Sequence, residues 1–197
     1  MSKKICILGD SIVQGYYDLE EGGWVNRLGI YFGKKYKEFN IFNLGINGAR
    51  SIDLLERMEH ELQVREANVI IISIGINDAL IEKDKNWVDK EKFKENLKKL
   101  LGISQKFTSD IFFVGILKVN EKFTAPVDWD DLFYYNKELT KYDSVIEEFC
   151  QEKKIVFIPM QDLLEEKDLL DGLHPNAEGH EKIFQQVRGF LEKNKII

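Results

Sequence analysis

The chain has 197 residues, of which 44% are hydrophobic and 31% charged, so one domain with a full hydrophobic core is expected. The formal net charge is −6, whereas nucleic acids and anionic membranes usually bind basic surfaces, and neither is expected as a partner. Every apolar run is far shorter than a membrane span, so we expect no stable membrane insertion.

Cysteine usage gives an expectation for the compartment. Cys6 lies within an apolar run and Cys150 at the end of a segment with helical spacing, so both are expected to be buried free thiols. The apolar run after Lys3 and Lys4 is too short for the core of a signal peptide. We therefore expect a cytoplasmic protein.

Short runs rich in β-branched or aromatic residues predict strands along the whole chain. In order they are Ile5–Leu8, Glu38–Leu44, Val69–Ile74, Ile111–Leu117 and Ile155–Ile158. All except Glu38–Leu44 are almost continuously apolar, which is typical of strands buried on both faces.

Segments with the apolar spacing of helices lie between these runs. Apolar stripes begin at Trp24, Ile52 and Phe93, and further helices are predicted within Leu132–Cys150 and Asn176–Lys193. Strands and helices thus alternate, which predicts one α/β domain over residues 1–197 with a mainly parallel five-stranded sheet and helices on both faces.

Four polar, glycine-bearing turns stand at the ends of elements. They are Gly9–Gly15, Asn43–Gly48, Gly75–Asp78 and Asp171–Asn176. The first and third turns directly follow predicted strands, and the second begins at the end of one. The last turn follows the final strand after a connecting stretch. Functional residues of open parallel sheets collect at the carboxyl ends of the strands, so these turns are expected to meet at one edge.

The residue types in these turns predict a serine hydrolase. A serine hydroxyl needs a base within hydrogen-bond reach and a group that orients the base. Ser11 follows the first strand, where its N–H can also point at a developing oxyanion. His174 can accept the Ser11 proton, and Asp171 can hold the other ring nitrogen.

The oxyanion requires further N–H donors. We expect them to be the Ser11 N–H, a glycine N–H of the second turn and the side-chain amide of Asn77. The chemistry does not choose between Gly45 and Gly48.

Several of these residues also have an ordinary structural interpretation. For Asp10, a role as N-cap of the helix after Ser11 is favoured over a role in catalysis. Asp10, Asp78 and Trp129 are kept as candidate substrate contacts. Trp24, Trp87, Phe133 and Tyr134 are expected in the core. His60 and His180 are expected at the surface or in packing contacts.

Taken together, the four turns resemble the motif blocks of the SGNH, or GDSL-type, hydrolases, named after a serine, a glycine, an asparagine and a histidine. The matching blocks are Gly9–Ile12, Asn43–Gly48, Gly75–Asp78 and Asp171–Pro175, and with Gly23–Val25 the similarity spans nearly the whole chain. Ile12 stands where the family name has leucine, a change that leaves the chemistry untouched.

This resemblance implies a flavodoxin-like three-layer α/β/α sandwich and an acyl-enzyme mechanism that needs no metal or other cofactor. It implies Ser11 as nucleophile, His174 as base and Asp171 as its partner. It also implies Ser11, Gly48 and Asn77 as oxyanion donors. The expected partner is a small-molecule ester of a simple acyl group, including esters of sugars, lipids or thiols.

Two other functions remain as alternatives. A metal-dependent phosphoesterase could draw its ligands from Asp10, Asn77, Asp78, Asp171 and His174, although such sites usually contain several histidines. A non-catalytic ligand-binding module on the same fold would be expected to have lost part of the serine machinery, which this chain retains.

Overall fold

The computed structural model describes residues 3–36, 39–128 and 130–196. At the centre of the molecule is a five-stranded parallel sheet with the strand order β2-β1-β3-β6-β8. The strands are β1 (Lys3–Gly9), β2 (Phe39–Gly45), β3 (Val69–Ser73), β6 (Ile111–Val114) and β8 (Val156–Ile158). All five predicted strands are confirmed, and their order is that of a flavodoxin-like sheet.

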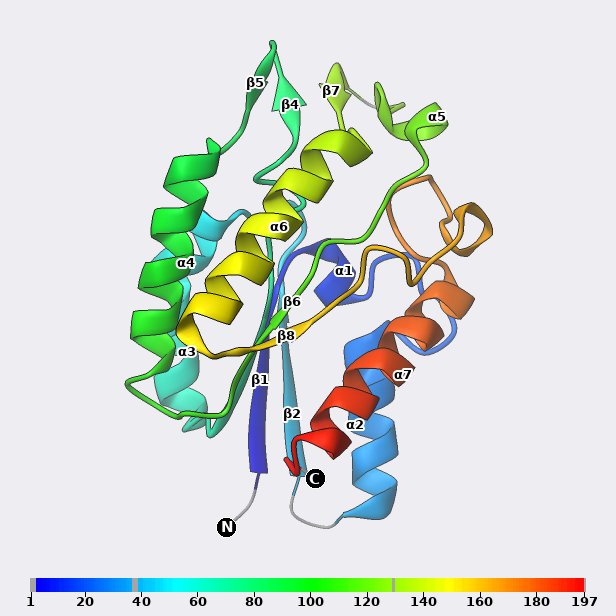
Figure 1. Cartoon of the computed structure of the whole chain (residues 1–197). Coiled ribbons are helices and arrows are strands. Elements are labelled where there is room, and N and C mark those ends of the chain that lie inside the picture. Colours follow the sequence, from blue (N-terminus) through cyan, green and yellow to red (C-terminus); the bar gives the residue numbers. More distant parts are fainter. Residues whose placement is uncertain (1–2, 37–38, 129, 197) are drawn as a thin grey trace.

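Helices cover both faces of this sheet (Figure 1). On one face α2 (Trp24–Lys35) packs against α7 (Ala177–Lys193). On the other face lie α3 (Ser51–Arg65), α4 (Lys90–Ser104) and α6 (Asn136–Lys153). The predicted three-layer α/β/α sandwich is therefore confirmed.

The core forms where the apolar runs predicted it. Ile5, Ile7 and Leu8 of β1 and Ile71 of β3 are completely buried, because helices shield both sides of these strands. Cys6 and Cys150 are buried free thiols, as expected. Within the described residues, none of the helices has the length and apolar character needed to cross a membrane.

A second, three-stranded antiparallel sheet was not predicted. Its strand order is β5-β4-β7, formed by β4 (Ile81–Glu82), β5 (Lys85–Asn86) and β7 (Leu132–Phe133). The helix predicted over Leu132–Cys150 consequently begins only at Asn136, because Leu132 and Phe133 pair with β4. This small sheet stands beyond the carboxyl ends of the central strands (Figure 1).

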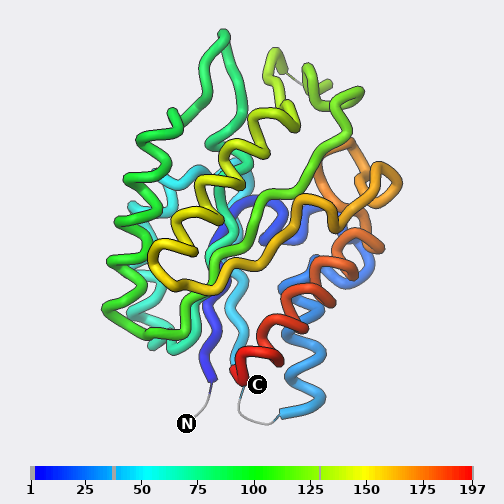
Figure 2. The backbone as a smooth tube through the Cα atoms, viewed as in Figure 1, coloured from blue at the N-terminus to red at the C-terminus, as the bar shows by residue number. Residues whose placement is uncertain are grey.

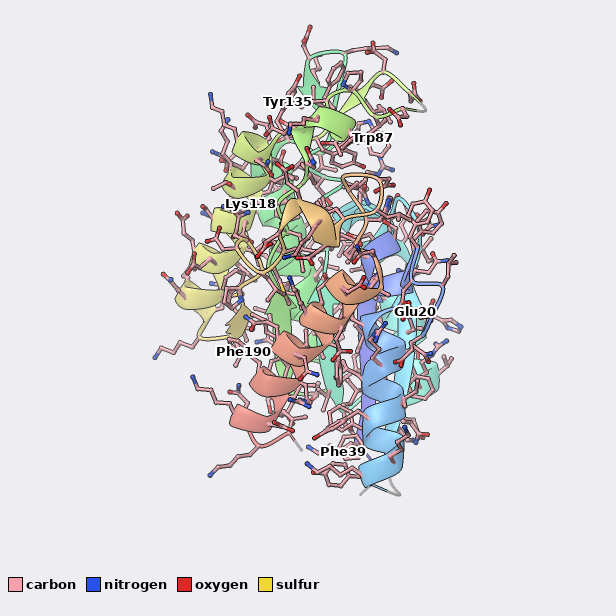
Figure 3. All side chains as sticks on the ribbon, turned by 90° about the vertical axis from the view of Figure 1, so that its right-hand side faces the viewer. Glu20, Phe39, Trp87, Lys118, Tyr135 and Phe190 are labelled. Atoms are coloured by element: carbon pink, nitrogen blue, oxygen red, sulfur yellow. The ribbon has the colours of Figure 1, made fainter. Side chains whose placement is uncertain are left out.

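Short helical segments complete the chain at the same end of the molecule. They are α1 (Ser11–Gln14), α5 (Glu121–Thr124) and a 3₁₀ helix at Glu166–Asp168. The segment that leads into α7 passes beside the segment after β1 (Figure 2). In the side view, Trp87 lies at this end and Phe39, at the start of β2, at the opposite end (Figure 3).

Candidate active site

Ser11 is held at the sharp turn between β1 and α1. The Asp10 carboxylate accepts from the N–H of Ile12 over 2.9 Å and caps the helix, so Ser11 is the first helical residue. A Cβ on Gly9 would lie 2.2 Å from the carbonyl oxygen of Ser73, so only glycine lets β1 pass β3 here. This turn presents the Ser11 side chain beyond the end of the sheet.

His174 and Asp171 face Ser11 from the turn before α7. His174 Nε2 lies 3.0 Å from Ser11 Oγ, and His174 Nδ1 lies 2.7 Å from Asp171 Oδ2. The other oxygen, Asp171 Oδ1, accepts from the backbone N–H groups of Leu173 and His174. The turn thus folds back on itself, and the carboxylate fixes both the loop and the ring.

Electrostatics favour an ionised Asp171. Burial raises its pKa, but hydrogen bonds from the His174 ring and from the backbone N–H groups of His174 and Leu173 outweigh burial, so the pKa falls below its usual value. A carboxylate at Nδ1 selects the tautomer with the proton on that nitrogen. His174 Nε2 is then free to accept the Ser11 proton.

The second and third turns bring two further groups to the same place. Gly48 and Asn77 line the same cleft as Ser11 and His174. Asn77 is buried, and its Nδ2 donates to the carbonyl oxygen of Ala49 over 3.0 Å. This amide therefore joins the third turn to the residue that follows the second turn.

Geometry separates the two candidate glycines. A Cβ on Gly45 would lie 2.2 Å from the backbone nitrogen of Gln14, so Gly45 is needed where β2 packs against α1. Gly48 has a φ of 72° and open space around its Cα, on the cleft wall. Gly48 is thus the glycine whose backbone can approach a substrate.

The three candidate substrate contacts have different outcomes. Asp10 and Asp78 are buried and do not line the cleft, so the structure gives them structural roles in place of the expected contacts. Asp10 caps α1, and both oxygens of Asp78 accept hydrogen bonds from Ser51. Burial raises the pKa of each carboxyl to about 6. Trp129 lies outside the described residues.

The cleft has a volume of about 360 Å³ and an aromatic wall that the sequence did not reveal. Tyr16 and Tyr17 come from the loop after α1, Trp87 from the segment after β5 and Tyr134 from the residue after β7. The rings of Tyr16 and Tyr17 meet the His174 ring edge-on, with centroids 5.0 and 5.6 Å away. We expected Trp87 and Tyr134 in the core, and Tyr134 is indeed buried while still bordering the cleft.

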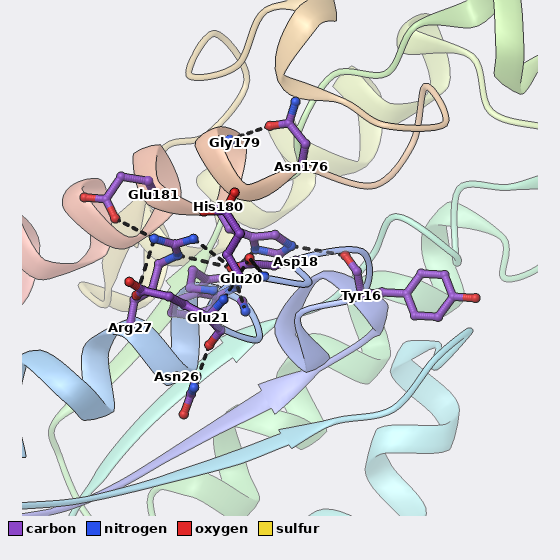
Figure 4. A network of polar contacts seen from close by, with 12 residues as sticks. Tyr16, Asp18, Glu20, Glu21, Asn26, Arg27, Asn176, Gly179, His180 and Glu181 are labelled. Carbon is purple, nitrogen blue, oxygen red and sulfur yellow. Dashed lines mark hydrogen bonds and ion pairs between the residues drawn. The ribbon is translucent and has the colours of Figure 1, made fainter.

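A polar network fixes the loop that carries the two tyrosines (Figure 4). The Asp18 carboxylate accepts from the N–H groups of Glu20, Glu21 and Gly23 and from the Arg27 guanidinium. Burial raises the pKa of Asp18, but these hydrogen bonds bring it below its usual value. The loop is therefore organised around one ionised carboxylate.

His180 ties this loop to α7. Its Nδ1 accepts from the N–H of Trp24 over 3.3 Å, so its Nε2 carries the proton and donates to the carbonyl oxygen of Tyr16 over 3.2 Å. His180 is completely buried, and burial lowers its pKa. It packs inside the protein, one of the two placements expected for it, and positions the Tyr16 backbone.

The metal-dependent alternative requires a group of side chains that can bind a metal ion. Among the residues that the structure describes, no three His, Cys, Asp or Glu side chains are grouped so that they could hold a metal ion. Of the ligands that a phosphoesterase would use, Asp10 and Asp78 are each occupied by the backbone hydrogen bonds described above.

Comparison with known proteins places the chain in a family. Solved structures with the same fold include an acetylxylan esterase from Geobacillus stearothermophilus, with a TM-score of 0.75 and 20% identity over 96% of this chain and 93% of that one. Three catalytic mutants of that esterase, which replace a serine, an aspartate and a histidine with alanine, are similar to a comparable degree.

A second similar structure is an α/β hydrolase from the metagenome of Lake Arreo, Spain, with a TM-score of 0.74 and 18% identity over 98% of this chain and 95% of that one. No curated protein sequence is significantly similar to this chain. The model of the GDSL-like lipase/acylhydrolase family matches residues 7–182, which include all four motif turns. The chain therefore belongs to the GDSL-like lipase/acylhydrolase family and is an esterase.

Proposed function

We propose that this protein hydrolyses carboxylic esters through a covalent acyl-enzyme on Ser11. The observation that carries the proposal is the continuous hydrogen-bonded series from Ser11 Oγ through His174 to Asp171, with distances of 3.0 and 2.7 Å. It lies in a cleft open to a small molecule, and the three residues come from two turns at the carboxyl edge of the sheet.

The first half of the reaction forms the acyl-enzyme. Ser11 Oγ attacks the ester carbonyl carbon while its proton passes to His174 Nε2, and Asp171 stabilises the resulting imidazolium. The carbonyl oxygen becomes an oxyanion, which accepts hydrogen bonds from the N–H groups of Ser11 and Gly48 and from Nδ2 of Asn77. The tetrahedral intermediate collapses, and the leaving alcohol takes the proton from His174.

The second half regenerates the enzyme. A water molecule gives a proton to His174 Nε2 and attacks the acyl carbon, with the same three donors around the oxyanion. Collapse of this second intermediate releases the carboxylic acid and returns the proton to Ser11 Oγ. Atoms and charges balance without any further reagent.

We propose small acyl groups, with acetyl esters first, as the substrates. The cleft volume of about 360 Å³ and its aromatic wall suit a small acyl group attached to a ring-shaped or planar leaving group. The similar acetylxylan esterase supports the inclusion of acetylated sugars. A panel of p-nitrophenyl esters of rising acyl length, with acetylated xylo-oligosaccharides and an acyl thioester, measures this preference.

The nucleophile is tested with a fluorophosphonate probe and the variant Ser11→Ala. The folded parent protein is expected to be labelled at Ser11 and to hydrolyse p-nitrophenyl acetate, and the variant is expected to do neither while melting at a similar temperature. An unlabelled but folded parent protein would leave the ligand-binding alternative. Hydrolysis that a chelator abolishes and a metal restores would favour the metal-dependent one.

A further inference from the structure

Tyr134 is a buried tyrosine whose hydroxyl faces the amide that we propose as an oxyanion donor. Its hydroxyl donates to Oδ1 of Asn77 over 2.8 Å. Only 5% of Tyr134 is exposed, yet it borders the same cleft as Asn77. The phenol therefore lies directly behind the amide, at the wall of the cleft.

The contacts of Asn77 leave one N–H for the cleft. A carboxamide has one acceptor oxygen and two N–H donors. Oδ1 accepts from Tyr134, and one N–H of Nδ2 donates to the carbonyl oxygen of Ala49. Because that carbonyl can only accept, it selects the orientation of the amide, while the Tyr134 hydroxyl satisfies the buried oxygen and holds the amide in place.

The small antiparallel sheet brings these two side chains together. Ile81 of β4 pairs with Phe133 of β7, so the turn that holds Asn77 and the residue after β7 stand side by side. The backbone of Tyr134 is then fixed by Thr124, whose carbonyl oxygen accepts from the Tyr134 N–H over 2.8 Å. The Thr124 hydroxyl donates back to the Tyr134 carbonyl oxygen over 3.1 Å.

We propose that Tyr134 is a positioning residue for the oxyanion site, which it orders through its hydrogen bond to Asn77. This proposal rests on the proposed function above. Since Asn77 also donates to the carbonyl of Ala49, the residue after Gly48, one phenol steadies two of the three oxyanion donors. A preorganised donor stabilises the transition state without reorganising during the reaction.

The phenol remains a donor over the working pH range. Burial raises the pKa of Tyr134, and the nearby carboxylates of Asp10 and Asp171 raise it further. The variant Tyr134→Phe removes only this hydroxyl. Tyr142→Phe is the matched control, because Tyr142 is also buried and its hydroxyl donates to the carbonyl of Val88, and neither of these two residues lines the cleft.

The experiment measures kcat and kcat/KM for p-nitrophenyl acetate at 10 °C, where variants that lose one hydrogen bond are expected to stay folded. Tyr134→Phe is expected to lower both constants by about tenfold to a hundredfold, less than the loss of a whole oxyanion donor. For Tyr142→Phe, both constants are expected to stay within about twofold of those of the parent protein, because the lost hydrogen bond affects only stability.

A double-mutant cycle separates positioning from general damage. In an Asn77→Ala background, Tyr134→Phe is expected to change kcat/KM by less than about twofold, because the amide that it positions is gone. An equal loss in both backgrounds would overturn the positioning role, as would full activity of Tyr134→Phe. If either of these two results appears while Ser11→Ala is inactive, the positioning role of Tyr134 is wrong and the proposed function stands. If the parent protein has no esterase activity, both the proposed function and the positioning role are wrong.

Discussion

Replacing Gly45 with alanine is expected to damage the site although Gly45 takes no part in the chemistry. The added Cβ would lie 2.2 Å from the backbone nitrogen of Gln14 and 2.7 Å from the carbonyl oxygen of Asp10. Ordinary contact begins at 3.4 Å, so β2 and α1 must move apart by about 1.2 Å. Both atoms belong to the backbone around Ser11, and no flexible side chain can absorb the shift.

The size of the effect follows from that displacement. Overpacking of this kind costs about 3 kcal/mol of the free energy of unfolding, which lowers the melting temperature of a chain of this length by about 6–12 °C. A misplacement of about 1 Å in the nucleophile lowers turnover by about a hundredfold. Thermal melting and p-nitrophenyl acetate hydrolysis measure the two effects on the same samples.

The melting temperature of Gly45→Ala is compared with that of Gly48→Ala. Gly48 has open space for a Cβ, and its only penalty is a φ of 72°, which costs an alanine about 1 kcal/mol or about 2–4 °C. We therefore expect Gly45→Ala to melt well below Gly48→Ala. If Gly45→Ala melts with the parent protein and keeps its turnover, the packing argument for the second turn is wrong.

Three further outcomes are expected. Asn77→Ala should lower kcat by about 10²–10³-fold, and a change confined to KM would contradict its oxyanion role. Asp171→Asn should lower kcat by about 10⁴-fold with normal folding, because an amide at Nδ1 of His174 favours the wrong tautomer; activity within tenfold of the parent would contradict this. Burial raises the pKa of Asp78 to about 6, so below that pH the folded protein keeps this carboxyl protonated, and the stability linked to the bound proton is lost as the pH rises through about 6. Urea unfolding of the parent protein and Asp78→Asn should therefore show the parent losing up to about 3 kcal/mol relative to the variant between pH 4 and pH 7, and a constant difference would contradict the shift.

The central sheet was predictable because burial on both faces leaves a local trace. Ile5–Leu8 and Val69–Ile74 consist almost wholly of apolar residues, and such short continuous apolar runs are typical of parallel strands that are buried on both faces. The small sheet left no such trace, since each of its strands has two residues. Its hairpin turn places Lys83 and Asp84 at positive φ, where Asn-Gly would have signalled the turn.

Some residues of the candidate site could likewise be predicted from the sequence, and others could not. Ser11, Asn77 and His174 each belong to a short motif whose order in the chain is itself informative, and the structure brings all three to one cleft. Tyr134 and Trp87 reach that cleft through tertiary packing, and a single aromatic residue has the same sequence signature in a core as in a wall. Asp78 is the opposite case, because it belongs to a motif but has a structural role and accepts hydrogen bonds from Ser51.

The distance along the chain between the two halves of the site has a consequence for folding. Ser11 and His174 are separated by 163 residues, and α7 is tied back to the first loop through His180 and the Tyr16 carbonyl. Closing so long a segment is entropically costly, so this contact is expected to form late, after the sheet has assembled. Recovery of esterase activity in a refolding experiment would then lag behind the recovery of secondary structure, and enzyme turnover would report the final docking step.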